Sequence, residues 1–255
     1  MKYIFSGHNK FDCKVDWLSK YLIYDKDLKV DDETIMNLGL GANMIKSLNY
    51  WIKVFEIEKL KYFLKKDIFF EKLESLYLLH YNLVKNASLY FLFFNKMSFY
   101  KFTKEDIFNF LNDFIVKNSL KVSLNTLKAD IDVFIRIYND LFKELDFIKK
   151  HNDFYKLKIK NKDEINDKLF LYFLADFIEM HKFDVSFSIS TIANGKFSLQ
   201  KTLLMSENIF LDKLQRLKEI SNGIFEYNES AVLREVYIKK NFKKEEFLED
   251  IYNEV

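Results

Sequence analysis

The chain has 255 residues, no proline and only five glycines, so few positions force the backbone to break. Proline removes a backbone hydrogen-bond donor and disrupts helix interiors, whereas glycine is frequent where helices end. Over most of the length, apolar residues recur at the spacing of three and four that is typical of a helix with one buried face. These features predict a mainly α fold.

The polar stretch from Lys149 to Asp167 is the best internal boundary, and glycines mark breaks elsewhere. We expect a helical region over 1–150 with two helix-turn-helix-like modules. A linker over 151–164 and a winged-helix-like domain over 165–255 then follow. The 255 residues are enough for this arrangement.

The first predicted module contains a short helix from Asp31 to Leu38, which Gly39 ends by taking a left-handed conformation. A longer helix follows, and its apolar stripe consists of Met44, Ile45, Leu48, Trp51, Ile52 and Phe55. A short helix, a tight turn and an amphipathic helix form the helix-turn-helix pattern. The charged stretch 57–70 lacks the glycine turn of a hairpin, which leaves open whether this module has a wing.

The second predicted module begins at Thr103, where a hydroxyl followed three residues later by the acid Asp106 is typical of a capped helix start. Ser123 is the expected N-cap of the next helix. The buried stripe of that helix is Leu124, Leu127, Ile131, Phe134, Ile135 and Tyr138, and its outward residues are Asn125, Lys128, Asp132 and Arg136. Acids on these helices, including Asp130 and Asp132, are explained by capping or surface solvation.

The third predicted module starts with a helix over 169–178, which is apolar nearly all round and therefore central in a packed domain. An amphipathic helix from Ser206 to Ile220 ends at Gly223. Two β-type runs follow, at 224–227 and 232–238, joined through 228–230. Helices followed by a small C-terminal β-hairpin predict a winged helix.

Several stretches resemble the bacterial family known as domain of unknown function 4007. They are Phe5-Ser6-Gly7-His8, Trp17-Leu18-Ser19-Lys20, 37–47, 123–134 and Leu233-Arg234-Glu235-Val236-Tyr237. The resemblance implies association with DNA modification and phage defence, because members of this family lie beside genes for these processes. It further implies a phosphorothioation-type or similar system.

Composition excludes several classes of protein. With Lys+Arg at 40 and Asp+Glu at 38 the net charge is +2, so any contact with nucleic acid must come from local patches. The single cysteine, Cys13, excludes an internal disulfide and fits a reducing cytoplasm. The N-terminus lacks the apolar stretch of about 7 to 15 residues of a signal peptide. Every apolar run is much shorter than the length of about 20 residues that a membrane span needs, so no membrane partner is expected.

Two helix faces carry the residue types that contact phosphates and base edges. The candidate DNA-binding residues are Asn43, Lys46, Ser47 and Asn49 on the first helix and Asn125, Thr126 and Lys128 on the second. An ordinary solvated helix face would carry similar residues. The basic run from Lys156 to Lys162 has three interpretations: a backbone contact, a linker, or an edge strand protected by lysines.

His8 follows a glycine turn and is the main candidate for catalysis, but no nucleophile elbow or second histidine at ligand spacing accompanies it. The alternative is structural: Phe5, Phe11 and Trp17 anchor this arm in the core while Ser6 and His8 satisfy backbone groups. The glycines near residue 40 lack the Gly-Lys-Ser/Thr of a nucleotide loop. We therefore predict no catalytic residue, no metal site and no cofactor.

The sequence favours a non-enzymatic DNA-binding accessory or regulatory protein of a DNA-modification system, with double-stranded DNA and possible protein components as partners. In this interpretation Lys46 and Lys128 contact phosphates. The alternative is a protein interaction adaptor that docks a sulfur-transfer or nuclease partner without touching DNA.

Overall fold

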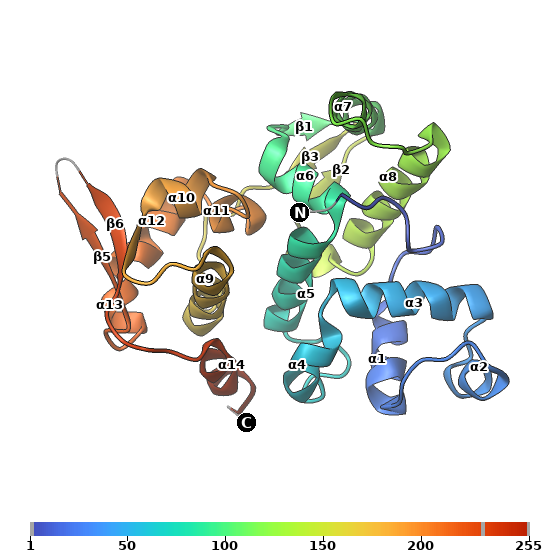
Figure 1. Ribbon diagram of the computed structural model, residues 1–255, viewed down its shortest axis with the longest axis horizontal. Helices are drawn as coiled ribbons and strands as arrows, with labels where there is room; N and C mark the ends of the chain where they lie inside the picture. Colours follow the sequence, from blue (N-terminus) through green and yellow to red (C-terminus); the bar gives the residue numbers. More distant parts are fainter. Residues whose placement is uncertain (1–2, 231–232, 254–255) are drawn as a thin grey trace. The chain divides into compact units, whose positions relative to one another are not determined.

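The computed structural model describes residues 3–230 and 233–253. The chain divides into two compact units, Met1–Lys158 and Ile159–Val255, and each is described by itself. Both units are mainly helical and both contain a small antiparallel sheet (Figure 1). The mainly α prediction is confirmed.

The first unit contains eight helices, one 3-10 helix and three short strands among its described residues. They are α1 (Val15–Tyr24), α2 (Asp32–Leu38), α3 (Ala42–Val54), α4 (Ile57–Leu64), α5 (Leu73–Asn86), α6 (Ser88–Lys96), β1 (Lys101–Phe102), α7 (Lys104–Lys117), α8 (Leu124–Asn139), η1 (Lys143–Leu145), β2 (Ile148–Lys150) and β3 (Tyr155–Leu157).

The predicted helix starts and stops near α2 and α3 are present. The Asp31 side chain accepts a hydrogen bond from the Thr34 N–H at 2.9 Å and caps α2. Gly39 has a φ of +62° and ends the same helix in the left-handed conformation. α1 packs against α2 and α3. The stretch after Phe55 forms helix α4 rather than a wing.

Side-chain N-caps also begin helices α7 and α8. The Thr103 side chain accepts from the Asp106 N–H, and the Asp106 carboxylate accepts from the Thr103 N–H at 2.7 Å, which completes a capping box. The Ser123 hydroxyl caps α8 by accepting from the Thr126 N–H at 3.1 Å. Both predicted N-caps are confirmed.

The core of the first unit is built around α5, α6 and α8, whose residues are buried over most of their lengths. His80 of α5 lies fully inside it, with its Nδ1 2.9 Å from the Tyr138 hydroxyl. Rings of Phe94, Phe142 and Phe147 surround this imidazole. His80 is therefore a core residue whose ring nitrogen has a partner.

The first sheet has the strand order β1-β3-β2 and is antiparallel throughout. Its central strand β3 lies inside 151–164, the stretch that the sequence suggested as a linker. Lys156 is thus in a central strand, and the edge-strand interpretation of the lysine run was wrong at this position. Strands of two or three residues are too short to give an alternating apolar pattern.

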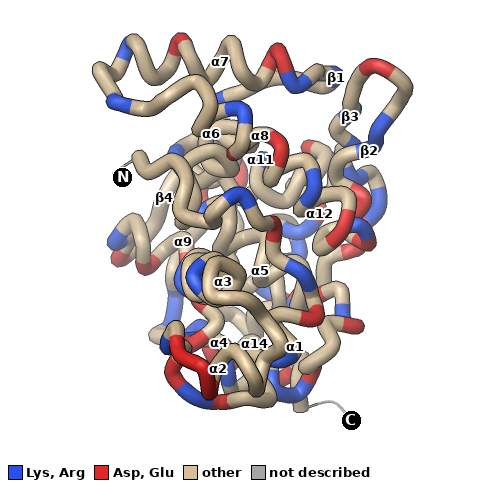
Figure 2. The backbone as a smooth tube through the Cα atoms, turned by 90° about the vertical axis from the view of Figure 1, so that its right-hand side faces the viewer, with Lys and Arg blue, Asp and Glu red and all other residues tan. Residues whose placement is uncertain are grey.

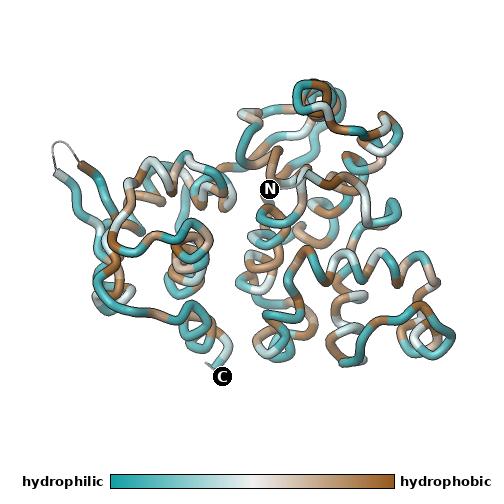
Figure 3. Tube along the Cα trace, in the orientation of Figure 1, coloured by the Kyte–Doolittle hydropathy of each residue, from teal (hydrophilic) through white to brown (hydrophobic). Residues whose placement is uncertain are grey.

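Along the chain, the second unit has one helix before strand β4, several helices after it, and then a pair of strands and a last helix. Its elements are α9 (Asp167–His181), β4 (Ser186–Ser188), α10 (Ile189–Asn194), α11 (Leu199–Thr202), α12 (Glu207–Gln215), α13 (Leu217–Ile220), β5 (Phe225–Glu229), β6 (Arg234–Ile238) and α14 (Lys244–Asn253). The predicted central helix corresponds to α9, which is buried from Leu169 to Ile178 and is largely hydrophobic in Figure 3.

Two details of the second unit differ from expectation. The helix expected from Ser206 to Ile220 is divided into α12 and α13 at Arg216. The predicted hairpin is present as β5 and β6, but a third strand, β4, pairs with β6 on its other side. Val232, placed by sequence in the second β run, lies outside the described residues.

Candidate nucleic-acid interface and the buried His8 site

Helix α3 carries the first predicted DNA-contacting set, and it presents one exposed stripe. Asn43, Lys46 and Lys53 are exposed and Tyr50 is half-buried, at spacings of three and four residues that place them on one face. α3 contains no acidic residue, whereas the preceding α2 is acidic at its start (Figure 2). The stripe is therefore a cationic and amide surface.

Ser47 does not belong to the surface, and Asn49 is only half-buried. Ser47 is fully buried, and its hydroxyl donates to the Phe11 carbonyl at 3.4 Å. The Asn49 amide donates to the Leu28 carbonyl at 3.3 Å and holds the loop before α2. The prediction that Ser47 faces DNA was wrong, because Ser47 is buried against the N-terminal arm, whereas Asn49 is half-buried against that loop.

The second predicted set is at the start of α8. Asn125 and Lys128 are exposed, and the Lys128 Nζ lies 5.6 Å from the Phe108 ring centroid. Thr126 is half-buried, with its hydroxyl 2.8 Å from the Ser123 hydroxyl as part of the cap. The accessible pair here is thus Asn125 and Lys128.

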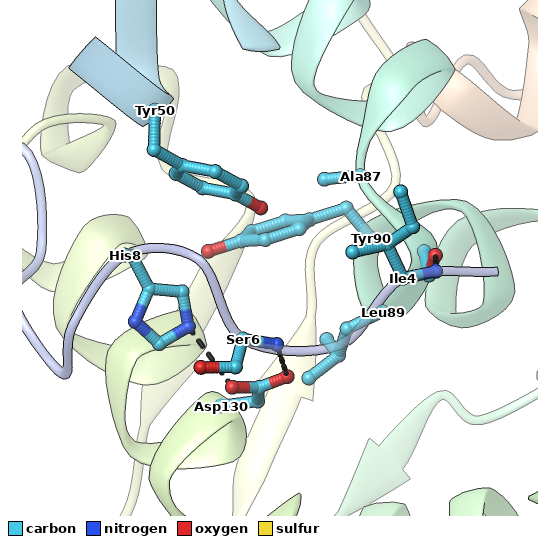
Figure 4. Close-up of a pocket in the computed structure, with 9 residues that line it drawn as sticks. Ile4, Ser6, His8, Tyr50, Ala87, Leu89, Tyr90 and Asp130 are labelled. Carbon is cyan, nitrogen blue, oxygen red and sulfur yellow. Dashed lines mark hydrogen bonds and ion pairs between the residues drawn. The ribbon is translucent and has the colours of Figure 1, made fainter. Parts of the chain in front are cut away.

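The N-terminal arm forms a buried polar site around His8 (Figure 4). His8 Nε2 lies 3.0 Å from Asp130 Oδ1, and both side chains are almost fully buried. Asp130 Oδ2 accepts from the Ser6 N–H at 2.9 Å. The prediction that Asp130 is solvated was wrong. Its place one helical turn from buried Leu127 and Phe134 was the available signal.

Both ring nitrogens of His8 are engaged. The Lys10 N–H donates to Nδ1 at 3.2 Å, which leaves the ring proton on Nε2, facing Asp130. The imidazole therefore has no free lone pair to act as a general base. This geometry fits the structural alternative, in which His8 and Ser6 hold the arm.

The pocket at this site is small and contains two tyrosines. Tyr50 and Tyr90 line it together with Asp130, and its volume of about 10 Å³ is that of a single water molecule. Burial raises the pKa of the Tyr50 phenol, and the Asp130 carboxylate raises it further. Burial likewise raises the pKa of Tyr90. Both phenols stay neutral near pH 7, and the pocket is too small for an organic substrate.

Charged residues fix the arm to α8. Arg136 Nε donates to Asp12 Oδ1 at 2.7 Å, and Arg136 Nη2 donates to the Lys10 carbonyl at 2.7 Å. Lys14 Nζ lies 2.6 Å from Asp12 Oδ2. Burial acts to raise the pKa of Asp12, but hydrogen bonds from Lys14 and Arg136 outweigh it and hold that pKa below its usual value.

The arm is not anchored by all three aromatic residues that sequence suggested. Trp17 is buried, but Phe5 is half-buried and Phe11 is 37% exposed. The Phe11 backbone makes the contact instead, because its carbonyl accepts from the Trp51 indole N–H at 3.2 Å. Polar contacts to α3 and α8 thus supply much of the anchoring.

In the second unit, the basic side chains at the C-terminal end of α12 form ion pairs with aspartates of the same unit. Lys213 is fully buried, and its Nζ lies 2.6 Å from Asp167 Oδ1 and 2.8 Å from Asp163 Oδ2. Arg216 pairs with the same two acids and with Asp212. The charges of Lys213 and of the C-cap residue Arg216 are therefore neutralised within the unit.

Within residues 3–230 and 233–253, no helix combines the length and the apolar character that a membrane span requires. Within the same residues no three or more His, Cys, Asp or Glu side chains are grouped as metal ligands.

Comparisons with known proteins show the fold and the family. The curated proteins contain no match to the chain. A solved structure described as "Magnesium ion-bound SspB crystal structure" is similar with a TM-score of 0.86 and 16% identity, over 98% of this chain and 88% of that one. Another, "SspB crystal structure", has a TM-score of 0.83 and 17% identity over the same shares. Residues 5–252 match the family described as "Protein of unknown function (DUF4007)", and the chain belongs to this family.

Proposed function

We propose that the protein binds double-stranded DNA in the bacterial cytoplasm as an accessory or regulatory component of a DNA-modification defence system of the phosphorothioation type. The observation that carries the proposal is the α3 stripe of Asn43, Lys46 and Lys53, which lies on a helix without acids. α3 follows α2 across a Gly39 turn and packs with α1, an order that supports the helix-turn-helix interpretation.

The chemistry of the stripe suits a duplex. The ammonium groups of Lys46 and Lys53 would contact phosphates, and the Asn43 amide would reach a base edge in the major groove. Asn125 and Lys128 at the start of α8 supply a second amide and ammonium group. Ser47 and Asn49 have no part in this proposal, because their side chains contact Phe11 and Leu28.

The second unit supports a winged-helix interpretation, because α9, β4, α10, α12 and the β5–β6 hairpin follow one another in that order. Its helix α12 exposes Glu207, Asn208, Asp212 and Gln215, whereas Lys213 and Arg216 are held by aspartates. We therefore assign DNA contact to the first unit rather than to α12.

This observation favours an alternative role for the second unit as a protein adaptor. A groove of about 300 Å³ lies between α10 and α12, with Ile189, Phe210 and Leu211 among its apolar lining residues and Arg234 of β6 at its edge. Such a mixed apolar and polar groove suits a protein segment better than a phosphate backbone.

The link to phosphorothioation in this proposal comes from the family resemblance. One neighbour is described as magnesium-bound. No step of the proposed function depends on a metal ion.

Gel-shift titration of the full chain with duplex DNA over a range of salt concentrations tests the proposal. Wild type should bind with a steep salt dependence. The Lys46→Glu/Lys53→Glu variant should lose about tenfold or more in affinity and about 2 in the log–log salt slope. Lys143→Glu on η1 is the matched control, because it reverses charge on another exposed lysine.

The outcomes separate the two functions. Absence of a shift at low salt would overturn DNA binding, as would equal affinity of the α3 variant and the control. The adaptor alternative predicts no shift, together with binding of a purified protein encoded beside this one that Leu211→Arg abolishes. Asn43→Ala should relax sequence preference more than affinity if α3 reads base edges.

A further inference from the structure

The sheet β1-β3-β2 has one buried and one exposed face. Phe102, Tyr155 and Ile148 are buried, and the first two rings are stacked with centroids 5.6 Å apart. Side chains alternate along a strand, so the intervening residues face outward. Lys101 is directly opposite Lys156 on one side, and Lys149 is directly opposite Lys156 on the other. We call these three residues the lysine row.

The lysine row is an unfavourable arrangement for the isolated fold. Neighbouring strands lie about 4.8 Å apart, and like charges directly opposite one another destabilise a sheet. In the part of the chain that the structure describes, none of the three forms an ion pair with an acid. Nearby Lys104 and Lys158, by contrast, pair with Asp132 and Asp146.

Protection of sheet edges does not explain the row. Lysines on edge strands prevent pairing with other chains, which would account for Lys101 and Lys149. Lys156 is on the central strand β3, where both sides are already hydrogen-bonded to neighbours. Binding of a negatively charged ligand, by contrast, would account for all three lysines.

Aromatic rings lie within the same surface. The Lys101 Nζ is 3.7 Å from the Phe154 ring centroid, and the Lys156 Nζ is 4.6 Å from that of Tyr100. His151 stacks on Phe154 with centroids 4.8 Å apart and an interplanar angle of 13°. Tyr100 is 56% exposed and offers its ring to an incoming group.

We propose that the lysine row and Tyr100 form a binding surface for single-stranded DNA. The ammonium groups would contact successive phosphates, and a base would stack on Tyr100, as in other proteins that bind single strands through basic grooves and aromatic platforms. A duplex hides the faces of its bases, so the exposed ring favours a single strand. The acid Asp153 lies in the turn between β2 and β3, outside the three paired lysine positions.

This surface goes beyond the proposed α3 interface and is tested separately from it. Fluorescence anisotropy of the full chain with a labelled oligothymidylate of about 20 nucleotides measures single-strand binding. The Lys101→Gln/Lys149→Gln/Lys156→Gln variant should bind at least about tenfold more weakly and lose about 2 in its log–log salt slope. Thermal unfolding should show that the variant remains folded, since it removes like-charge repulsion.

Two further variants complete the test. Tyr100→Ala should weaken binding about fivefold or more, whereas Tyr100→Phe should bind as wild type because the ring is kept. Lys46→Glu/Lys53→Glu should affect duplex binding and leave the oligothymidylate affinity unchanged. The inference is overturned if wild type does not bind the oligothymidylate, or if the lysine-row variant binds it as tightly as wild type. Loss of duplex binding alone would instead contradict the α3 proposal.

Discussion

The ring of Tyr50 on α3 lies directly over Gly7, so that a Cβ atom at Gly7 would be 2.6 Å from two of its carbons. Gly7 has a φ of +128°, a conformation that residues with a side chain rarely adopt. The N-terminal arm therefore passes under α3 at a point where only glycine fits. This contact links the arm that carries His8 to the helix that we propose to bind DNA.

Gly7→Ala should lower the free energy of unfolding by roughly 2 to 4 kcal/mol, because it adds both backbone strain and a clash with Tyr50. Urea unfolding followed by circular dichroism measures the change. Gly39→Ala is the matched control: Gly39 also has a positive φ, of +62°, but no atom lies within 4 Å of the added Cβ. Equal losses in the two variants would show that the Tyr50 contact contributes nothing.

Asp130→Ala should lower the free energy of unfolding by about 2 to 4 kcal/mol, because the Ser6 N–H loses its acceptor and His8 loses its buried carboxylate. Chemical denaturation of the full chain tests this. Asp132→Ala, two residues away on α8, removes a carboxylate whose side chain is 49% exposed and should cost much less. This structural role agrees with the contacts of His8, because a general base needs a ring nitrogen without a partner and both nitrogens of His8 face one.

Stability should fall with pH below about 4, in part because of Asp12. Its folded-state pKa lies below the usual value of 3.8, so the unfolded chain takes up a proton at a higher pH than the folded chain. The stabilisation is present above the unfolded pKa and is lost as the pH falls through the folded one. Denaturation at several pH values should show Asp12→Asn to be destabilised by about 1 to 3 kcal/mol at pH 7.

The difference in the free energy of unfolding between wild type and Asp12→Asn should disappear as the pH falls below about 4, because protonation then removes the same charge in wild type. A constant gap across this range would contradict the assigned pairing with Lys14 and Arg136. The measurement isolates Asp12, since other carboxylates titrate equally in both proteins.

Lys213→Met should destabilise the second unit by about 2 to 4 kcal/mol. The substitution leaves the Ile165 carbonyl and two aspartates without their buried donor, and Arg216 replaces it only in part. Thermal unfolding compares it with Lys218→Met, whose lysine side chain is 69% exposed and whose loss should have little effect. Similar midpoints for the two variants would contradict a structural role for Lys213.

Local sequence chemistry was sufficient for several of the helix boundaries. A side chain that caps a helix acts within three residues of its own position, as Asp31, Thr103 and Ser123 do, and Gly39 ends α2 through its own backbone freedom. Such interactions do not depend on the rest of the fold. The mainly α class, the exposure of Lys46 and the C-terminal hairpin could be predicted for the same reason.

The candidate sites depended on contacts between residues far apart in the chain. Asp130 lies 124 residues from Ser6, and Lys213 lies 46 residues from Asp167. Helical spacing places Asp130 near a buried face, but no local pattern identifies the distant partners of these buried charged residues. Ser47 was misplaced for the same reason, because the arm that covers it is distant in sequence.

The sequence by itself determined that the chain is mainly helical, where its capped helices begin, and which residue types are available to contact DNA. The tertiary structure decided which of those residues remain accessible and which charges neutralise one another. It also aligned Lys101, Lys149 and Lys156 in one row, because strand pairing joins segments that are about 50 residues apart. Burial and pairing are properties of the assembled unit, so they cannot be obtained from the order of residues along one helix.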